Sequence, residues 1–203
     1  MRPDPVLGTQ GYAEQAGDLV KRYEEVSFID KHQAVLHLLP KAPATILDIG
    51  AGTGADAAWL ASRGHRVVAV EPTKEFRVCG MELHPSRSIE WVDDSLPRLA
   101  SMLARDERFD AIMLAAVWMH LDESERRMAM PRLASLLAPG GILVMSLRHG
   151  PVPAGRRMFQ VSGAEAISLA QDSGLRPLLE TRTESIQGAN RKAGVSWTHL
   201  AFH

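Results

Sequence analysis

Three glycines in "ILDIGAGTGADAAWL" (46–60) have the spacing that most directly suggests chemistry in this chain. They follow a short apolar run, alternate with Ala51 and Thr53, and precede an alanine-rich helical pattern. The sequence from Gly50 to Ala55 matches G-x-G-x-x-G/A, in which glycines let the backbone approach a ligand closely. The motif predicts a nucleotide-type ligand at a strand–helix turn, either a dinucleotide pyrophosphate or a different group.

Acidic residues close the first three predicted strands and help to choose between these ligands. Asp48 lies two residues before the first glycine, Glu71 follows the second strand, and Asp93 and Asp94 follow the third. Glu71 is placed to accept hydrogen bonds from both hydroxyls of a ribose. A carboxylate at Asp48 is unfavourable beside a pyrophosphate and favourable beside an ammonium group. The alternative is that Asp48 and Asp93 only cap turns or helices. The acids favour a cationic cofactor such as S-adenosylmethionine over a dinucleotide.

The elements that must position these residues alternate between two patterns. Short apolar runs rich in Val and Ile are typical of strands buried on both faces of a parallel sheet, and they occur at 44–49, 65–70, 88–92, 109–114 and 141–147. Helical patterns separate them at 54–63, 73–82, 96–105 and 123–137, with a kink or break expected at Pro131. This alternation predicts an α/β fold with an open sheet.

The two ends of the chain complete a predicted single domain. Residues 1–40 are expected to form an N-terminal helical cap, 41–150 the ligand-binding core, and 151–203 a substrate-side loop, a helix at 163–173 and a closing strand pair. The last two strands, 175–182 and 195–202, have no helix between them and should pair antiparallel. "APGG" (138–141) is expected to stop a helix and turn into the fifth strand.

Composition excludes several classes of function. The 203 residues carry a formal net charge of −1, which gives no reason to expect attraction to nucleic acid or to a membrane surface. The single cysteine, Cys79, rules out an internal disulfide and predicts a cytoplasmic protein. No His/Cys cluster has metal-ligand spacing, so no metal is expected. The expected partner is a small-molecule substrate.

The successive motifs resemble those of the class I S-adenosylmethionine-dependent methyltransferases, closest to their small-molecule branch. The resemblance rests on "ILDIGAGTG", "VVAVEPT", "IEWVDDSLP", "FDAIMLAAVWMHL" and "LLAPGGILVMSL", in that order, within about residues 40–150. It implies a Rossmann-like seven-stranded sheet of order 3-2-1-4-5-7-6 with strand 7 antiparallel and helices on both faces. It also implies S-adenosylmethionine as cofactor and contacts at Asp48, Gly50, Ala51, Gly52, Gly54, Glu71, Pro72, either Asp93 or Asp94, Ser95 and the backbone around Ala115.

Methyl transfer needs alignment of the reacting groups more than a covalent catalyst. A hydroxyl acceptor would in addition need a general base, for which His120 in "VWMHL" is the first candidate and His149 in "SLRHG" the second. The alternative for His120 is a purely structural hydrogen bond. The predicted activity is therefore O-methylation of a small molecule. Two alternative functions remain: an NAD(P)-dependent oxidoreductase and a non-catalytic S-adenosylmethionine-binding protein.

Further residues are candidates for substrate binding. Tyr12 and Tyr23 lie in the predicted cap and would serve either as lid residues or as packing, and Trp118 would line the pocket or belong to the core. Basic residues gather in two segments expected on the carboxyl edge of the sheet: Arg148, His149, Arg156 and Arg157, and then Arg191 and Lys192. They favour an anionic acceptor, with Arg148 and Arg156 as its ligands, unless they form only a solvated rim.

Overall fold

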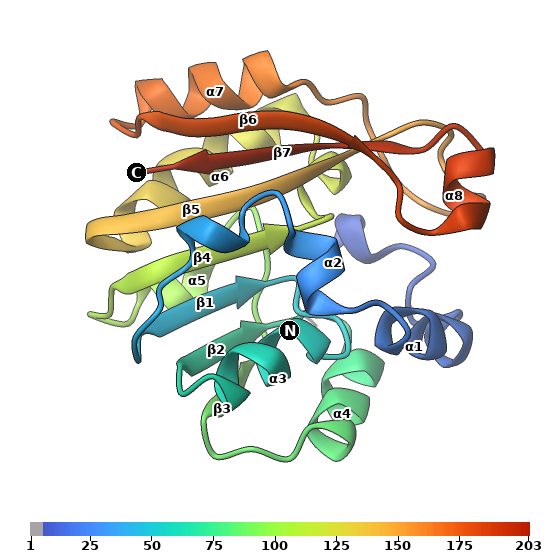
Figure 1. Cartoon of the computed structure of the whole chain (residues 1–203), viewed down its shortest axis with the longest axis horizontal. Helices are drawn as coiled ribbons and strands as arrows, with labels where there is room; N and C mark the ends of the chain where they lie inside the picture. The colour runs from blue at the N-terminus through green and yellow to red at the C-terminus, as the bar shows by residue number, and fades with distance from the viewer. Residues whose placement is uncertain (1–5) are drawn as a thin grey trace, which may run out of the picture.

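A seven-stranded sheet organises the computed structural model, which describes residues 6–203. Its order is β3-β2-β1-β4-β5-β7-β6, from bottom to top of Figure 1. All neighbouring strands are parallel except β7, which runs antiparallel to β5 and β6. The strands are β1 Thr45–Ile49, β2 Arg66–Val70, β3 Ile89–Val92, β4 Phe109–Ala115, β5 Leu137–His149, β6 Pro177–Glu184 and β7 Ser196–Phe202. The predicted fold class and strand order are confirmed.

Helices pack on both faces of this sheet (Figure 1). The α-helices are α1 Ala16–Glu24, α2 Phe28–His32, α3 Ala55–Ser62, α4 Lys74–Leu83, α5 Ala100–Leu103, α6 Glu123–Leu136, α7 Gly163–Asp172 and α8 Gly188–Lys192. Three short 3-10 helices, η1 Leu7–Thr9, η2 Leu36–Leu38 and η3 Trp118–His120, complete the described chain. No helix within residues 6–203 is long and apolar enough to cross a membrane.

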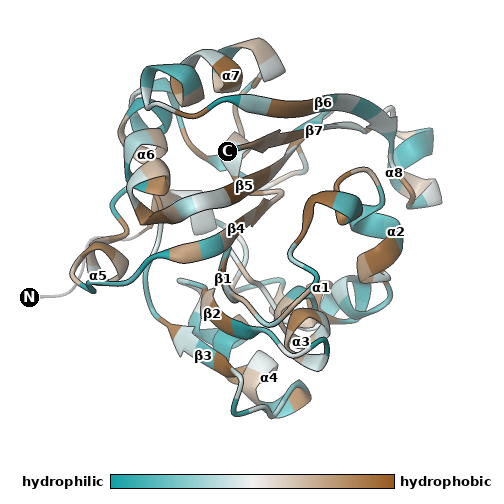
Figure 2. Cartoon of the chain, turned by 60° about the vertical axis from the view of Figure 1, so that its left-hand side comes forward, coloured by the Kyte–Doolittle hydropathy of each residue, from teal (hydrophilic) through white to brown (hydrophobic). Residues whose placement is uncertain are grey.

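Alternation along the strands divides the buried side chains between two cores. In β1, Leu47 and Ile49 face the core formed with α6 and α7, whereas Ile46 faces the core formed with α2 and α3. Successive strand residues point to opposite faces, so a strand covered on both sides must be apolar throughout. Figure 2 shows this as hydrophobic colour along β4 and β5, inside the molecule.

One predicted helix is much shorter than expected. The segment 96–105 is helical only over α5, Ala100–Leu103. Proline disfavours a helical conformation in the residue before it, and Leu99 has a φ of +47°, in the left-handed region. The backbone therefore cannot take up a right-handed helix before Ala100.

Two further expectations concern prolines. Pro131 lies inside α6, which remains one continuous helix from Glu123 to Leu136, so the expected break is absent. The turn expected at 138–141 forms as an interruption inside β5: Leu137 pairs with Phe109, and pairing resumes at Ile142 with Ala111.

Candidate functional site

The glycine turn between β1 and α3 forms the floor of the site. The φ angles of Gly50 and Gly52 are +72° and +57°, which L side chains rarely adopt. A Cβ at Gly50 would lie 2.4 Å from Cγ2 of Val117, so glycine is also required by space. The Val70 carbonyl accepts hydrogen bonds from the N–H groups of Gly50 and Ala51, at 2.8 and 3.0 Å. The turn is thus fixed by backbone contacts to β2.

A cavity of about 730 Å³ opens over this turn, at the carboxyl ends of the parallel strands. Its volume is within the range of small-molecule sites. All residues of the motif except Gly54 line it: Gly50, Ala51, Gly52, Thr53 and Ala55. Gly54 does not: a Cβ there would lie 2.7 Å from the ring of Trp91, so this glycine serves close packing.

Glu71 joins the glycine turn to the end of β2 and lines the cavity. Its Oε2 accepts from the Gly52 N–H at 2.9 Å, and its Oε1 accepts from the Thr73 N–H at 2.7 Å. Burial raises the pKa of the carboxyl, and these hydrogen bonds oppose the rise. Each carboxylate oxygen can accept a second hydrogen bond, so Glu71 can still receive ligand hydroxyls.

Asp48 lies beneath the turn with only 2% of its surface exposed. Its Oδ2 has no hydrogen-bond partner among the residues that the structure describes, and Asp48 does not itself line the cavity. Burial, together with the negative charge of Asp56, raises the pKa of the Asp48 carboxyl. Buried acceptors are normally satisfied, so this oxygen calls for a donor such as a ligand ammonium or a bridging water.

A buried ion cluster beside Asp48 had no signal in the sequence. Oδ2 of Asp56 lies 2.7 Å from Nζ of Lys31 and 2.8 Å from Nε2 of His32. Burial opposes ionisation of Asp56, but the Lys31 ammonium and the His32 imidazole outweigh it and hold the pKa of the carboxyl well below its usual range. This cluster ties α2 to α3, and Lys31 and Asp56 both line the cavity.

The two acids after β3 point in different directions relative to the cavity. Asp94 lines the cavity together with Ser95, whereas Asp93 points outward, with its side chain 68% exposed, and forms a 2.6 Å ion pair with Arg77. The Asp94 carboxylate accepts from the N–H groups of Ser95 and Met102, at 2.8 and 3.0 Å. Asp93 is therefore not a residue of the cavity, and Asp94 is. Pro72 and Ala115 also line it, as expected.

His120 lies in η3 and lines the cavity. Its Nδ1 is 2.8 Å from the Arg157 carbonyl oxygen, which can only accept, so Nδ1 carries the proton. Its Nε2 is 3.0 Å from the Tyr12 hydroxyl and accepts from it. Burial, followed by the charges of Arg156, Arg157 and Arg148, lowers the pKa of His120. The imidazole is therefore held neutral with its lone pair toward Tyr12.

His149 does not belong to the cavity. It follows Arg148 in β5, and successive strand residues point to opposite faces. Arg148 lines the cavity, and His149 instead places Nε2 2.8 Å from the Thr198 hydroxyl on the other side of the sheet. The expectation that His149 is a second general base is therefore wrong.

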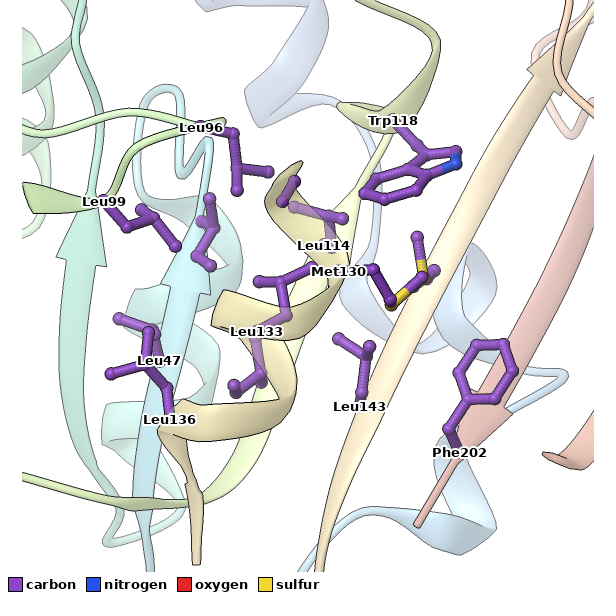
Figure 3. Close-up of a cluster of buried hydrophobic side chains, with 14 of the residues drawn as sticks. Leu47, Leu96, Leu99, Leu114, Trp118, Met130, Leu133, Leu136, Leu143 and Phe202 are labelled. Atoms are coloured by element: carbon purple, nitrogen blue, oxygen red, sulfur yellow. The ribbon is translucent and has the colours of Figure 1, made fainter. Parts of the chain in front are cut away.

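Trp118 also lies outside the cavity. Figure 3 shows its indole above Met130 and Leu114, in the core between the sheet and α6. The side chain is fully buried, and Nε1 has no hydrogen-bond partner within residues 6–203. The η3 turn directs this ring inward while His120, two residues later, faces the cavity. The proposed substrate contact at Trp118 is corrected to a core residue.

The N-terminal segment closes one side of the cavity through two tyrosines and an arginine. Tyr12 and Tyr23 both line the cavity, and both pack against Phe76. The Arg156 guanidinium lies 3.7 Å from the centre of the Tyr12 ring and donates to the Gln10 carbonyl and to Oε1 of Gln15, at 3.3 and 2.8 Å. Arg156 thus holds the N-terminal segment in place.

Of the predicted basic rim, only Arg148 and Arg156 face the cavity. Arg157 forms ion pairs with Asp122 and Glu125, at 3.0 and 2.8 Å. Arg148 donates one hydrogen bond, of 2.8 Å, to the Pro151 carbonyl, and no carboxylate of the described chain lies within 4.0 Å of it. Among the four basic residues predicted after β5, Arg148 is therefore the cavity-lining cation with the fewer internal partners. The other members of the rim, Arg191 and Lys192, lie in α8 and do not line the cavity.

Comparison with known proteins places this site in a family. Residues 47–145 match the family described as "Methyltransferase domain". An uncharacterised methyltransferase of Mycobacterium tuberculosis is 31% identical over 134 residues, covering 63% of this chain and 49% of the relative. Glycine N-methyltransferase of Mus musculus is 29% identical over 137 residues, covering 58% of this chain and 47% of the relative. The chain thus spans about half the length of these curated relatives.

A solved structure extends the likeness over most of the fold. The 1,6-didemethyltoxoflavin-N1-methyltransferase of Burkholderia thailandensis, solved with its substrate and S-adenosylhomocysteine, superposes with a TM-score of 0.71 at 20% identity and covers 94% of this chain and 84% of that one. The matched core, the strand order and the glycine turn with its acids agree with one another. The match over residues 47–145 and the strand order together give this chain the core and the fold of the class I S-adenosylmethionine-dependent methyltransferases.

Proposed function

We propose that this protein transfers a methyl group from S-adenosylmethionine to a hydroxyl group of a small, anionic acceptor. The observation that carries the proposal is a single cavity that joins the glycine turn to the lone pair of His120 and to the available guanidinium of Arg148. The relatives and the solved structure are methyltransferases, and the solved structure contains S-adenosylhomocysteine. The single cysteine and the net charge of −1 support a cytoplasmic protein without nucleic-acid or membrane partners.

The residues beside the glycine turn fit this cofactor better than a dinucleotide. Glu71 can accept from ribose hydroxyls, and Asp94 and Ser95 line the same cavity and could hydrogen-bond an adenine. The orphaned Oδ2 of Asp48, beneath the turn, suits an ammonium that reaches it through a bridging water. The carboxylates of Glu71 and Asp94 line the cavity and would repel a pyrophosphate, which argues against the oxidoreductase alternative.

S-adenosylmethionine supplies an electrophilic methyl group when bound. The chain then has three tasks: to orient the acceptor, to exclude water, and to take up the hydroxyl proton. Arg148 would hold the anionic group of the acceptor through a guanidinium fork. Nε2 of His120 would receive the proton once the acceptor hydroxyl displaces the Tyr12 hydroxyl from it, with Nδ1–H anchored on the Arg157 carbonyl. Tyr12 and Tyr23 would shield the reaction from solvent as part of the N-terminal segment.

Methyl transfer to nitrogen is the second candidate. Two of the similar proteins are N-methyltransferases by name, one of them acting on glycine and one on 1,6-didemethyltoxoflavin. A neutral amine attacks through its own lone pair and needs no base to generate the nucleophile. In that case His120 would only anchor Tyr12, and its replacement would change turnover little.

The proposal is tested with the labelled methyl donor. Titration calorimetry should give a dissociation constant of about 1 μM for S-adenosylhomocysteine and no measurable binding of NAD or NADP. Incubation with methyl-labelled cofactor and a panel of hydroxy and amino acids should label a hydroxy acid. Comparable binding of NAD would refute the cofactor, a labelled amine would favour the second candidate, and cofactor binding without any labelled product would indicate a non-catalytic binding protein.

A further inference from the structure

The cavity extends beyond the glycine turn and Glu71, over one face of the β5–β7–β6 part of the sheet. Two cross-strand rows line this extension. The first row is Ser146 on β5, His199 on β7 and Thr181 on β6, and the second row, one pleat further, is Arg148, Trp197 and Thr183. We call these six residues the polar wall.

The polar wall is continuous with the region around Ala115. The Ser146 hydroxyl accepts from the N–H of Ala116 at 3.0 Å, which fixes the first row next to the end of β4. Thr183 and His199 form a 3.0 Å hydrogen bond between the two rows. A ligand on the wall would therefore lie beside the reacting groups and share one cavity with the cofactor.

Several polar groups of the wall lack partners within residues 6–203. The half-buried Thr181 hydroxyl and Trp197 indole N–H make no hydrogen bond there, and Arg148 makes only the one to Pro151. Facing residues add further polar groups to the lining: Gln33, Ser185, Gln187 and Asn190. Polar groups that line a cavity normally pair with a ligand or with water.

We propose that the polar wall is the acceptor subsite and that it selects an acid with a hydroxyl-bearing body over a short acid or one with an apolar body. The inference rests on the proposed function, since it assigns the acceptor of that same cavity. The carboxylate of the acceptor pairs with Arg148, and its body runs over Trp197 toward Thr181 and Thr183. An aliphatic body would leave the Thr181 hydroxyl and the Trp197 indole N–H without partners.

Matched acids test this selection directly. D-gluconate and hexanoate both have six carbons and one negative charge, and they differ in hydroxyl groups, whereas glycolate is a short hydroxy acid. We expect gluconate to bind about five- to tenfold more tightly than hexanoate or glycolate, because one or two further hydrogen bonds form. Binding is followed by NMR on the Trp197 indole N–H resonance, which is assigned by its absence in Trp197→Phe.

Variants on the two faces of the sheet supply the control. Thr181→Val should remove most of the advantage of gluconate and leave hexanoate unchanged, because it replaces only a hydroxyl that has no internal partner. Thr183→Val serves as the second variant if Thr181→Val unfolds. It should also reduce the advantage of gluconate, and because it removes the hydrogen bond to His199 as well, its gluconate affinity is judged against its own hexanoate affinity. Thr198→Val, on the opposite face of β7 against His149, should retain the full advantage.

The outcomes separate this inference from the proposed function. The titrations are made with and without S-adenosylhomocysteine, whose own affinity tests the proposed function. If S-adenosylhomocysteine fails to bind, the proposed function is wrong. The ratio of the gluconate and hexanoate affinities of the cofactor-free protein still tests whether the polar wall is a subsite. Equal or tighter binding of hexanoate, a gluconate effect that spares Trp197, or an unchanged advantage in both threonine variants would overturn the subsite.

Discussion

The two sides of the cavity are built in different ways. The cofactor cradle, Gly50–Gly52 with Asp48 and Glu71, is fixed by backbone: its N–H groups bond to the Val70 carbonyl and to the Glu71 carboxylate. The N-terminal segment opposite is held by side chains, chiefly by the latch that Arg156 forms with Gln10, Gln15 and Tyr12.

This difference has consequences for both energy and motion. The cradle is part of the sheet, and disturbing it should disturb the fold. The latch joins residues about 140 positions apart through a partly exposed guanidinium, and such contacts are weak individually. The cradle should therefore behave as a rigid element, and the latch should open without unfolding of the sheet.

The largest effect should come from Gly50→Ala in the cradle. The new Cβ would meet Val117 at 2.4 Å with φ at +72°, so overpacking adds to backbone strain. We expect a loss of about 2–5 kcal/mol in the free energy of unfolding, measured by urea denaturation, and no detectable binding of S-adenosylhomocysteine. Gly140→Ala is the matched control, because its φ is +77° and nothing lies within 4 Å of its Cβ position. Equal losses in the two variants would show that Val117 does not constrain the turn.

One residue of the cradle, Asp48, should strengthen cofactor binding but destabilise the fold. Asp48→Asn removes a buried carboxyl whose pKa is raised by burial and by Asp56. Because that pKa is higher in the folded than in the unfolded protein, Asp48 destabilises the fold increasingly as pH rises above about 4. The variant should therefore have a higher Tm than the wild type at pH 7 without cofactor, with the difference vanishing toward pH 4.

Cofactor affinity should move the opposite way in the same variant. Loss of the negative charge should weaken binding of S-adenosylhomocysteine about ten- to a hundredfold if Asp48 serves its ammonium. A variant that gains stability and keeps its full affinity would reduce Asp48 to a structural residue. Calorimetry and thermal unfolding of the same samples give both quantities.

The cradle is the region that could be predicted from the sequence. Its ligand-facing atoms are backbone N–H groups, and the glycine spacing records the conformation that exposes them. The strand order followed from the resemblance of successive motifs, and the antiparallel closing pair from the missing helix. The choice between Asp93 and Asp94 could not be made, because it depends on which way one residue turns after β3.

The rest of the site depends on contacts between distant segments. Lys31 reaches Asp56, Tyr12 reaches His120, and the polar wall needs β5 to pair with β7 and not with β6, the strand that follows it in the chain. Hydrophobic and turn patterns report local geometry and carry no information on such pairings. His149 was misplaced for a simpler reason: the strand was expected to end at 147, and its extension to His149 imposes alternation on Arg148 and His149.

A smaller effect is expected from the latch. Arg156→Ala removes two hydrogen bonds and a cation–π contact, and should raise the KM for the acceptor about tenfold while changing kcat little. Urea denaturation should show an almost unchanged free energy of unfolding, in contrast to Gly50→Ala. Lys192→Ala, a cation outside the cavity, is the control. A kcat loss larger than the KM effect would mean that Arg156 acts in the chemical step.

The smallest expected effect concerns pH and connects the latch to His120. Burial and the neighbouring arginines lower the pKa of His120, so its lone pair is available at any pH above that lowered value. For a hydroxyl acceptor, kcat/KM should be flat near pH 7 and should decline only below pH 6.5, about tenfold per unit. Arg156 contributes one of the charges that lower this pKa, so Arg156→Ala should move the acid limb to higher pH.

The same depressed pKa means that protonation of His120 favours the unfolded protein, so the free energy of unfolding should also fall as pH decreases below 6.5. A profile that is flat to pH 5 in both proteins would argue against His120 as the base and would favour an acceptor that is already ionised over this range, such as a carboxylate.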